Sequence, residues 1–564
     1  MQQHVFTIAE VCAQYGVTDA IICPGSRSAP LVYAFTNNNS FTCHSAIDER
    51  SAAFIALGIA QQQQRPVVLI CTSGTATLNF FPAIAEAYYQ KIPLLVLSAD
   101  RPPELLNQQD GQMIMQKGVF GKHVLGSHEL LCFEEDNIDF QLTERIVSNA
   151  LDTCLSERGF GPVHINVPLR EPLYNYDFQK LDLKESKSPI SFQKRGAIQL
   201  PNFEGFMAAW KHSKKKLIVM GQWPISQTLS ESLIALCKNN GVVILADVCA
   251  NQHLPKSVTN FDFILKSVQT EILDQLRPDL LLSFGGPLVS KSLKNWLKSF
   301  NPTWHFRLQA SEDAIDTWGN MTHLLCAPEI PYLSAIAKQK EVAIEEKNQY
   351  FNLWKSQQEK AESTLTQFHA KQVWSEPTSI HQILSLIPNG SILQVGNSSA
   401  IRWTSWNFPL RNDLEVFCNR GTSGIDGSFS TAVGAAIAKP DKFVYLIIGD
   451  LSFNYDEHAL WIQKLPINLK VIVLNNKGGN IFNWIDGPSK HPQKLSFFTT
   501  PLTRSIAQVC ASYQVEHRLA ENSEQLQNHL VQTEKNNALT VIELTFDKLT
   551  AANAIQSFLT LKLV

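Results

Sequence analysis

Short apolar runs alternate with helix-like segments along the first third of the chain. Val67–Cys71 and Leu94–Leu97 are short and uninterrupted by polar residues, as buried strands are. Between such runs, Ser51–Gln61 and Asn79–Tyr89 are rich in alanine and carry the apolar spacing of helices. Alternating strands and helices predict a parallel sheet covered by helices, which is an α/β fold. Further strands are expected at Ala20–Cys23 and Val163–Val167.

The same alternation recurs twice more, and polar segments separate the three units. A chain of 564 residues is too long for one hydrophobic core and should form about three or four domains. Residues 175–200 are polar and lysine-rich, which predicts a linker, and 341–370 predicts a long charged helix that bridges two units. We therefore expect three α/β domains, at 1–174, 201–340 and 375–564. The expected strands of the middle domain are Lys216–Met220, Val242–Ala246 and Leu280–Phe284.

Composition and charge narrow the classes of partner. The chain is 44% hydrophobic and 18% charged with a formal net charge of −3, so no nucleic acid and no membrane partner is expected. Its 11 cysteines are scattered without a C-x-x-C pair, which favours a reducing compartment. The N-terminus has no signal-peptide pattern, and no apolar stretch approaches the roughly 20 residues that a membrane span needs. These features predict a cytoplasmic protein.

Two apolar runs of the C-terminal unit end in glycine and oxygen-bearing side chains. Phe443–Ile448 leads through Gly449 into Asp450, and Val471–Leu474 leads into Asn476. Parallel sheets bind ligands at the carboxyl ends of their strands, so neighbouring strands would bring these oxygens together. Either segment alone is also compatible with a polar strand end or an asparagine turn. Their pairing favours a Mg²⁺ site beside a diphosphate, because Mg²⁺ takes few protein oxygens and completes its shell with phosphate and water.

A second candidate is Glu49, which opens the helix expected at Ser51–Gln61. Carboxylates are common in a first helical turn because they interact with the macrodipole and the free N–H groups. Glu49 lies between Ile47 and an alanine pair, so it is also a candidate for a semi-buried carboxyl with a raised pKa. Such a group is suited to proton transfer near neutral pH.

Five cationic residues each lie beside a turn or an expected strand end. Any one of them is also explained as a surface or ion-paired cation. Together they suggest a site for several carboxylates, which arginine binds bidentately. They are Arg27, Arg101, Lys291, Arg402 and Arg420.

A glutamate in the N-terminal unit, with Gly-Asp and Asn-Asn in the C-terminal one, resembles the thiamine diphosphate (ThDP) enzyme superfamily. The turn at Gly74–Asn79 and the segment Gly161–Pro168 also resemble its N-terminal domain. The resemblance implies two similar domains that hold the cofactor across the interface of a homodimer or homotetramer, with a third domain between them. It implies that Glu49 bonds the aminopyrimidine and drives its tautomerisation. It also implies that Mg²⁺, with Mn²⁺ as an alternative, is held by Asp450, Asn476 and the Gly478 carbonyl.

Five longer motifs are similar to one branch of that superfamily, the 2-succinyl-5-enolpyruvyl-6-hydroxy-3-cyclohexene-1-carboxylate (SEPHCHC) synthases of menaquinone biosynthesis. They begin at Pro24, Asp48, Thr72, Ser98 and Asn419. The resemblance implies decarboxylation of 2-oxoglutarate on ThDP and 1,4-addition of the resulting carbanion to isochorismate. It further implies substrate contacts from Ser26, Arg27, Arg101, Gln112, Lys291, Ser398, Arg402 and Arg420. The cofactor contacts that it implies include Gly449, Leu451 and Ser452, with Ile425 as the apolar wedge that bends the cofactor and Ile481 and Phe482 as pocket walls.

Three positions depart from the pattern of that branch, which often has other residues at Gly111, Met115 and Ser292. These departures affect the expected isochorismate contacts and not the cofactor site. Two other functions fit the superfamily: a different ThDP-dependent 2-oxo acid carboligase or decarboxylase, and a catalytically silent subunit of the same fold. The number of arginines disfavours the first, and intact Glu49, Asp450 and Asn476 disfavour the second.

Overall fold

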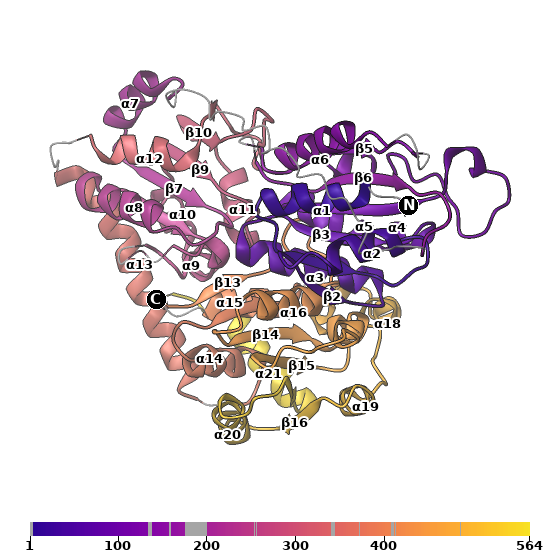
Figure 1. The fold of residues 1–564 in the computed structure, drawn as a ribbon. Helices are drawn as coiled ribbons and strands as arrows, with labels where there is room; N and C mark the ends of the chain where they lie inside the picture. The colour runs from indigo at the N-terminus through magenta and orange to yellow at the C-terminus, as the bar shows by residue number, and fades with distance from the viewer. Residues whose placement is uncertain are drawn as a thin grey trace.

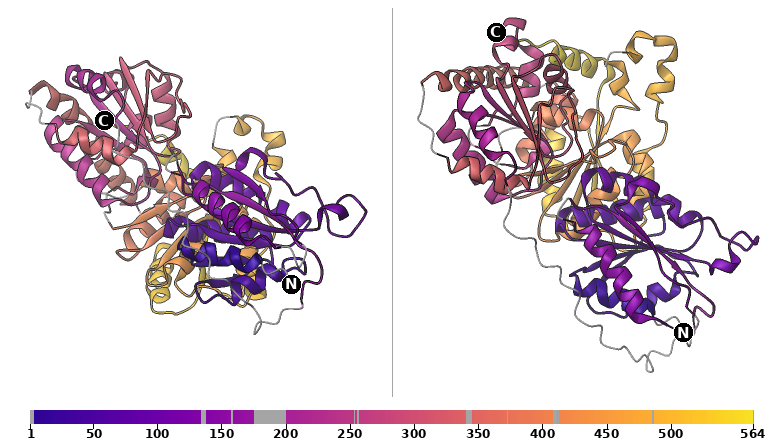
Figure 2. Two further views of the ribbon diagram at one scale, coloured as in Figure 1. Left: turned by 45° about the horizontal axis from the view of Figure 1, so that its top comes forward. Right: turned by 90° about the horizontal axis from the view of Figure 1, so that it is seen from above.

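A computed structural model describes residues 4–133, 138–156, 159–174, 200–252, 254, 257–339, 345–371, 373–407, 411, 413–484 and 487–563. These residues form three parallel sheets flanked by helices (Figure 1). The middle unit forms a lobe beside the N- and C-terminal units, which pack on each other (Figure 2). The predicted α/β fold class is therefore confirmed. The linker expected at 175–200 lies, except for its last residue, outside the described residues.

The N-terminal sheet has the order β2-β1-β3-β4-β6-β5. Its central strands are buried along their whole length, which explains their continuous apolar runs. The strands are β1 (Asp19–Ile22), β2 (Thr42–Ser45), β3 (Val67–Cys71), β4 (Leu94–Asp100), β5 (Gly126–Glu129) and β6 (Val163–Pro168). The helices are α1 (His4–Gln14), α2 (Ala29–Thr36), α3 (Glu49–Gln63), α4 (Thr75–Asn79), α5 (Phe81–Gln90) and α6 (Phe140–Cys154).

The helix expected at Asn79–Tyr89 is α5, which begins two residues later, at Phe81. Asn79 is the last residue of α4, and Phe80 separates the two helices. Pro82 lies in the first turn of α5, where its missing N–H costs no helical hydrogen bond. The apolar spacing continues across the break and so does not reveal it.

The middle sheet has the order β11-β10-β9-β7-β8. Its strands are β7 (Lys216–Met220), β8 (Val243–Ala246), β9 (Leu280–Phe284), β10 (Trp304–Gln309) and β11 (His323–Cys326). Its helices are α7 (Phe203–His212), α8 (Gln227–Asn240), α9 (Phe261–Ser267), α10 (Thr270–Gln275), α11 (Lys291–Lys298) and α12 (Glu329–Ala337). The long charged helix expected at 341–370 is α13 (Glu345–His369), which runs from the middle unit towards the C-terminal one (Figure 1).

The C-terminal sheet has the order β13-β12-β14-β15-β17-β16, which is the N-terminal order with the strands renumbered. Both sheets therefore place their third and fourth strands side by side at the centre. The strands are β12 (Ile392–Val395), β13 (Glu415–Phe417), β14 (Val444–Gly449), β15 (Leu469–Asn475), β16 (Glu516–Ala520) and β17 (Thr540–Thr545). The helices are α14 (Glu376–Leu386), α15 (Ser399–Asn407), α16 (Ser428–Ala438), α17 (Asp450–Tyr455), α18 (Leu495–Thr499), α19 (Ile506–Ser512), α20 (Ser523–Glu534) and α21 (Lys548–Leu559).

Helices α3 and α16 join these two similar units (Figure 1). Each helix brings a glycine against the backbone of the other. A Cβ on Gly58 would lie 2.1 Å from the Thr431 carbonyl oxygen, and one on Gly434 would lie 2.0 Å from that of Ile55. The glycines therefore allow the two helices to approach closely, and α3 is the helix that begins with Glu49.

Gly58→Ala is expected to destabilise the fold, although alanine normally favours a helix by about 1 kcal/mol over glycine. The added methyl group would force α3 and α16 apart, which costs about 1–3 kcal/mol as other overpacked cores do. Chemical denaturation of the wild type and the variant measures this difference, and Gly434→Ala tests the same contact from the other helix. Unchanged or increased stability in both variants would contradict the packing described.

Within the described residues, no helix is both long enough and apolar enough to cross a membrane.

Candidate active site

The metal-site candidates lie where β14 and β15 end. These strands are parallel neighbours, with Gly449 opposite Leu474, so the predicted pairing of the two apolar runs is confirmed. Helix α17 begins at Asp450, whose side chain is buried. Its Oδ1 accepts a hydrogen bond from the Leu451 N–H at 2.7 Å, and its Oδ2 accepts one from the Gly478 N–H at 2.8 Å. One carboxylate therefore ties the two loops together.

The atoms around Asp450 fit a divalent cation. Burial raises the pKa of Asp450 to about 7, and the nearby charge of Glu376 adds to this shift. The Oδ1 atom of Asn476 is buried and, within the described part of the chain, accepts no hydrogen bond. A carboxylate, an amide oxygen and the nearby Gly478 carbonyl are the hard oxygen donors that Mg²⁺ prefers. Among these three donors only Asp450 is acidic. Elsewhere in the described residues, no cluster of three or more His, Cys, Asp or Glu side chains could hold a metal ion.

The glycines of these loops leave room for backbone and ligand. A Cβ on Gly449 would meet nothing within 4 Å, so the space above the strand end is open. Gly478 has a φ of +133°, and a Cβ there would lie 2.4 Å from the Thr499 carbonyl oxygen. A side chain is therefore excluded at Gly478, and the site fits a diphosphate held near the backbone.

Ile425 lies beside these loops, because the Ser452 hydroxyl donates a hydrogen bond to the Ile425 carbonyl. Ile425 is 42% exposed, so its side chain is accessible to a molecule bound at these loops. Ile481 is buried and Phe482 is partly buried, in the short 3₁₀ helix Asn480–Asn483 that follows the second loop. The three apolar candidates thus flank the same strand ends.

Glu49 is the first residue of α3, but it does not cap the helix. Asp48 takes that role, since its side chain accepts a hydrogen bond from the Ser51 N–H at 3.1 Å and pairs with His458 at 2.5 Å. Glu49 is half-buried, and the side-chain hydrogen bond that it accepts from the described residues is long, 3.4 Å from the Asn79 amide. Burial raises the pKa of Glu49 above its usual range. Glu49 thus lies in the first helical turn as expected, but Asp48 accepts the helix N–H, so the Glu49 carboxyl stays available for another partner.

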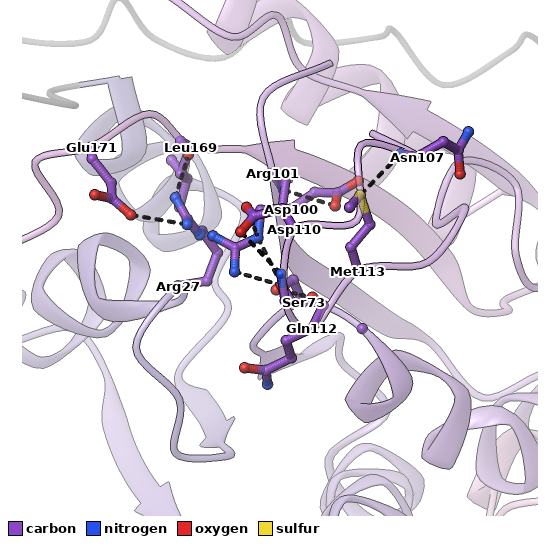
Figure 3. A network of polar contacts seen from close by, with 12 residues as sticks. Arg27, Ser73, Asp100, Arg101, Asn107, Asp110, Gln112, Met113, Leu169 and Glu171 are labelled. Carbon is purple, nitrogen blue, oxygen red and sulfur yellow. Dashed lines mark hydrogen bonds and ion pairs between the residues drawn. The ribbon is translucent and has the colours of Figure 1, made fainter. Parts of the chain in front are cut away.

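The N-terminal substrate candidates lie in the segments that follow β1 and β4, and Figure 3 shows the polar contacts of Arg27, Arg101 and Gln112. Arg27 is buried and donates to the Leu169 carbonyl at 3.0 Å and to Glu171 at 3.1 Å. Arg101 pairs with Asp110 at 3.0 Å, and its Nε donates to the Gly111 carbonyl at 3.1 Å.

Gln112 completes this group. Its carbonyl accepts a hydrogen bond from the Ser73 hydroxyl at 2.9 Å, and its side chain extends away from the bonded network (Figure 3). Ser26 and Met115 are exposed, Met115 by 77%. Gly111, one of the departures from the family pattern, therefore contributes a carbonyl that orients Arg101.

The C-terminal cations lie in two segments that follow β12 and β13. Arg402, on α15, donates to the Ser398 carbonyl at 2.8 Å, and Ser398 has a φ of +71°. Arg420 donates to the Asn397 Oδ1 at 2.9 Å, while its buried Nε has no partner among the described residues. Burial and the neighbouring charge of Arg420 lower the pKa of Arg402, so the two guanidinium groups are close enough to repel each other.

Lys294 is a middle-domain cation that interacts electrostatically with these arginines, and the sequence did not point to it. Lys291 is exposed in the first turn of α11. Lys294 lies one turn further along and is partly buried, and its pKa is lowered by burial and by the charges of Arg420 and Arg402. Lys294 and Gly421 also line one cavity of about 610 Å³ between the N-terminal and middle units. Lys291 and Lys294 are three residues apart and therefore share one face of α11. The sequence alone could not decide which of the two lies near the arginines.

Glu86 holds the loop that carries Arg420 and was also missed. From the buried face of α5, its carboxylate accepts hydrogen bonds from the N–H groups of Gly421 and Thr422, at 2.7 and 2.6 Å. It also accepts one from the Thr422 hydroxyl at 2.5 Å. A carboxylate inside an alanine-rich helix is the signal that could have revealed it, because buried acids need partners.

Comparison with known proteins identifies the class. Residues 5–119 match a family described as thiamine pyrophosphate enzyme, N-terminal TPP binding domain. Residues 186–395 match the middle domain of thiamine pyrophosphate enzymes, and 394–544 match their C-terminal TPP binding domain. The chain is therefore a thiamine diphosphate enzyme with the three domains of that class.

The relatives define the family. The chain is 39% identical to the 2-succinyl-5-enolpyruvyl-6-hydroxy-3-cyclohexene-1-carboxylate synthase of Desulfotalea psychrophila, over 93% of this chain and 94% of the relative. The protein of the same name from Flavobacterium psychrophilum is 39% identical, over 88% of this chain and 87% of the relative. The one from Bacteroides thetaiotaomicron is 33% identical, over 93% of this chain and 92% of the relative. The chain belongs to the SEPHCHC synthase family.

Proposed function

We propose that this chain catalyses the reaction for which its family is named. It would decarboxylate 2-oxoglutarate and add the remaining four-carbon unit 1,4 to isochorismate, releasing CO₂. One loop carries the proposal: Arg420 lies at its start among the cations, and the Ile425 carbonyl at its end accepts a hydrogen bond from Ser452 beside Asp450. Carboxylate-binding cations and the diphosphate site are therefore held together, as a reaction between two carboxylate-bearing substrates requires.

Thiamine diphosphate, when bound, supplies the nucleophilic carbon and accepts the electron pair left after loss of CO₂. Asp450, Asn476 and the Gly478 carbonyl would hold its Mg²⁺, with Mn²⁺ as an alternative. The carboxyl of Glu49 would hold a proton at the pyrimidine nitrogen, which its raised pKa favours. Arg27, Arg101, Gln112, Arg402 and Arg420 would bind and orient the substrates, together with Ser26, Ser398 and a lysine of α11.

A second copy of the chain would complete the site. No hydrogen bond or ion pair between described residues joins Glu49 of one chain to its own Asp450 or Asn476. Ile47, Leu78 and Ile425, near these two candidate positions, are each more than 40% exposed. We therefore propose a homodimer or homotetramer in which Glu49 of one copy faces the metal loops of another, measurable by light scattering. The 11 cysteines and the absence of a disulfide among those described favour a cytoplasmic location.

The direct test is isochorismate consumption by the purified chain with ThDP, Mg²⁺ and 2-oxoglutarate. Loss of isochorismate absorbance that depends on all four components supports the proposal. Equal turnover with pyruvate would indicate another ThDP-dependent carboligase or decarboxylase. No turnover and no ThDP binding by calorimetry would indicate a silent subunit of this fold.

Lys294→Met is expected to raise the KM of a carboxylate substrate by about tenfold or more, because a charge-assisted hydrogen bond contributes about 1.5–3 kcal/mol. Lys291→Met is the matched control, since it removes the same side chain from the same helix face three residues earlier. Steady-state kinetics with each substrate varied in turn measures both. A larger effect at Lys291 than at Lys294 would return the role to the lysine expected from the sequence.

A further inference from the structure

Glu376 is a buried carboxylate next to the metal loops. It is the first residue of α14, only 1% exposed, and burial raises its pKa. Its Oε1 accepts hydrogen bonds from the side-chain amides of Asn476, at 3.0 Å, and Asn480, at 3.2 Å. Its Oε2 accepts one from the Trp403 indole N–H at 2.8 Å. A carboxylate only accepts hydrogen bonds, so all three neighbours must present N–H groups to it.

This requirement orients the Asn476 amide. With its Nδ2 donating to Glu376, its Oδ1 must point to the other side, where it is buried and accepts nothing from the described residues. The reversed amide would place an oxygen against the Glu376 carboxylate and turn N–H groups towards the cation site. Both contacts would be repulsive.

We propose that Glu376 is a positioning residue that fixes the Asn476 amide with its oxygen towards the divalent cation. This inference rests on the cation site proposed above. Glu376 does not touch the cation but determines which atom of Asn476 does. Through Asn480 it also holds the start of the 3₁₀ helix that carries Ile481 and Phe482. Removing a group that orients a metal ligand typically lowers metal affinity by about 10–100-fold.

Glu376→Gln separates this role from packing. Glutamine has one oxygen and one NH₂ group, and three N–H donors face it. The Trp403 indole is fully buried and has only an N–H donor to offer. Each asparagine amide, in contrast, can rotate by about 180° and present its oxygen in place of its NH₂ group. We expect the glutamine oxygen to accept the hydrogen bond from Trp403. The glutamine NH₂ group would then face Asn476, whose amide would rotate so that its oxygen faces the glutamine and its NH₂ group faces the cation site. Mg²⁺ affinity in the presence of ThDP should then fall about 10–100-fold.

The double variant Glu376→Gln with Trp403→Phe supplies the test. Without the indole N–H, the glutamine oxygen can face both asparagines, and Asn476 keeps its native orientation. The double variant should therefore bind Mg²⁺ more tightly than Glu376→Gln alone, although it loses a buried hydrogen bond and is less stable. A packing role predicts the reverse, because two core changes would weaken the site more than one.

Mg²⁺ is titrated by calorimetry into wild type, both single variants and the double variant, each saturated with ThDP, with thermal unfolding measured alongside. Trp403→Phe alone should keep wild-type Mg²⁺ affinity despite a lower Tm. Wild-type affinity in Glu376→Gln, or a double variant no tighter than that single variant, would overturn the inference. If the wild type takes up no Mg²⁺ with ThDP, the proposed cation site fails and this inference fails with it.

Discussion

Glu49→Gln is expected to leave the fold intact and to lower kcat by about 10²–10⁴-fold, the usual contribution of a positioned acid–base group. The amide has nearly the same shape as the carboxyl but cannot hold or release the proton at the pyrimidine nitrogen. Glu49 makes only one long hydrogen bond to the described residues, so the change should cost little stability. Stopped assays of isochorismate consumption, with unfolding curves of both proteins, measure the two effects separately.

Asp48→Asn is the matched control, because it changes the neighbouring carboxylate at the start of the same helix. Its amide oxygen can still accept from the Ser51 N–H, while the pairing with His458 is weakened. We expect a lower Tm with most of the turnover retained. Near-normal kcat in Glu49→Gln, or equal losses in the two variants, would remove Glu49 from the proposed proton transfer.

The sequence located the two loops that carry the candidate metal ligands because the change in residue type at a strand end is a local signal. A buried strand must be apolar along its length, so the change to glycine and oxygen-bearing residues marks its carboxyl end. The adjacency of β14 and β15 then follows from the strand–helix alternation. The position of Glu49 was likewise evident, although only the structure shows that Asp48 and not Glu49 caps α3.

What the sequence did not reveal depends on contacts between distant segments. Glu376 and Asn476 are 100 positions apart, and Glu86 and Gly421 are 335 apart. Each carboxylate lies in an ordinary helical segment, and only the packing of the units gives it N–H partners. The choice between Lys291 and Lys294 has the same origin, because it depends on how α11 lies against the C-terminal unit.

Asp450→Ala is expected to weaken Mg²⁺–ThDP binding by more than about 100-fold. Removing a group that only orients a metal ligand typically costs about 10–100-fold in affinity, and this variant removes the proposed charged ligand itself. Its carboxylate also joins the two loops through the Leu451 and Gly478 N–H groups. Calorimetric titration of ThDP at saturating Mg²⁺ measures the loss, and unchanged affinity would exclude Asp450 as a ligand.

Without the cofactor, the charge of Asp450 is expected to make the stability of the native state depend on pH. A carboxyl with a pKa raised to about 7 destabilises the native state as pH rises between its ordinary value and 7, since the folded chain opposes its ionisation. Asp450→Asn removes that charge, but its single oxygen can accept from only one of the Leu451 and Gly478 N–H groups, which lowers its Tm at every pH. As the pH rises from about 5 to about 8, the cofactor-free wild type should therefore lose Tm relative to the variant, and the variant should gain no stability from Mg²⁺ and ThDP. A large Tm increase on adding both to Asp450→Asn would show that the cation is held elsewhere.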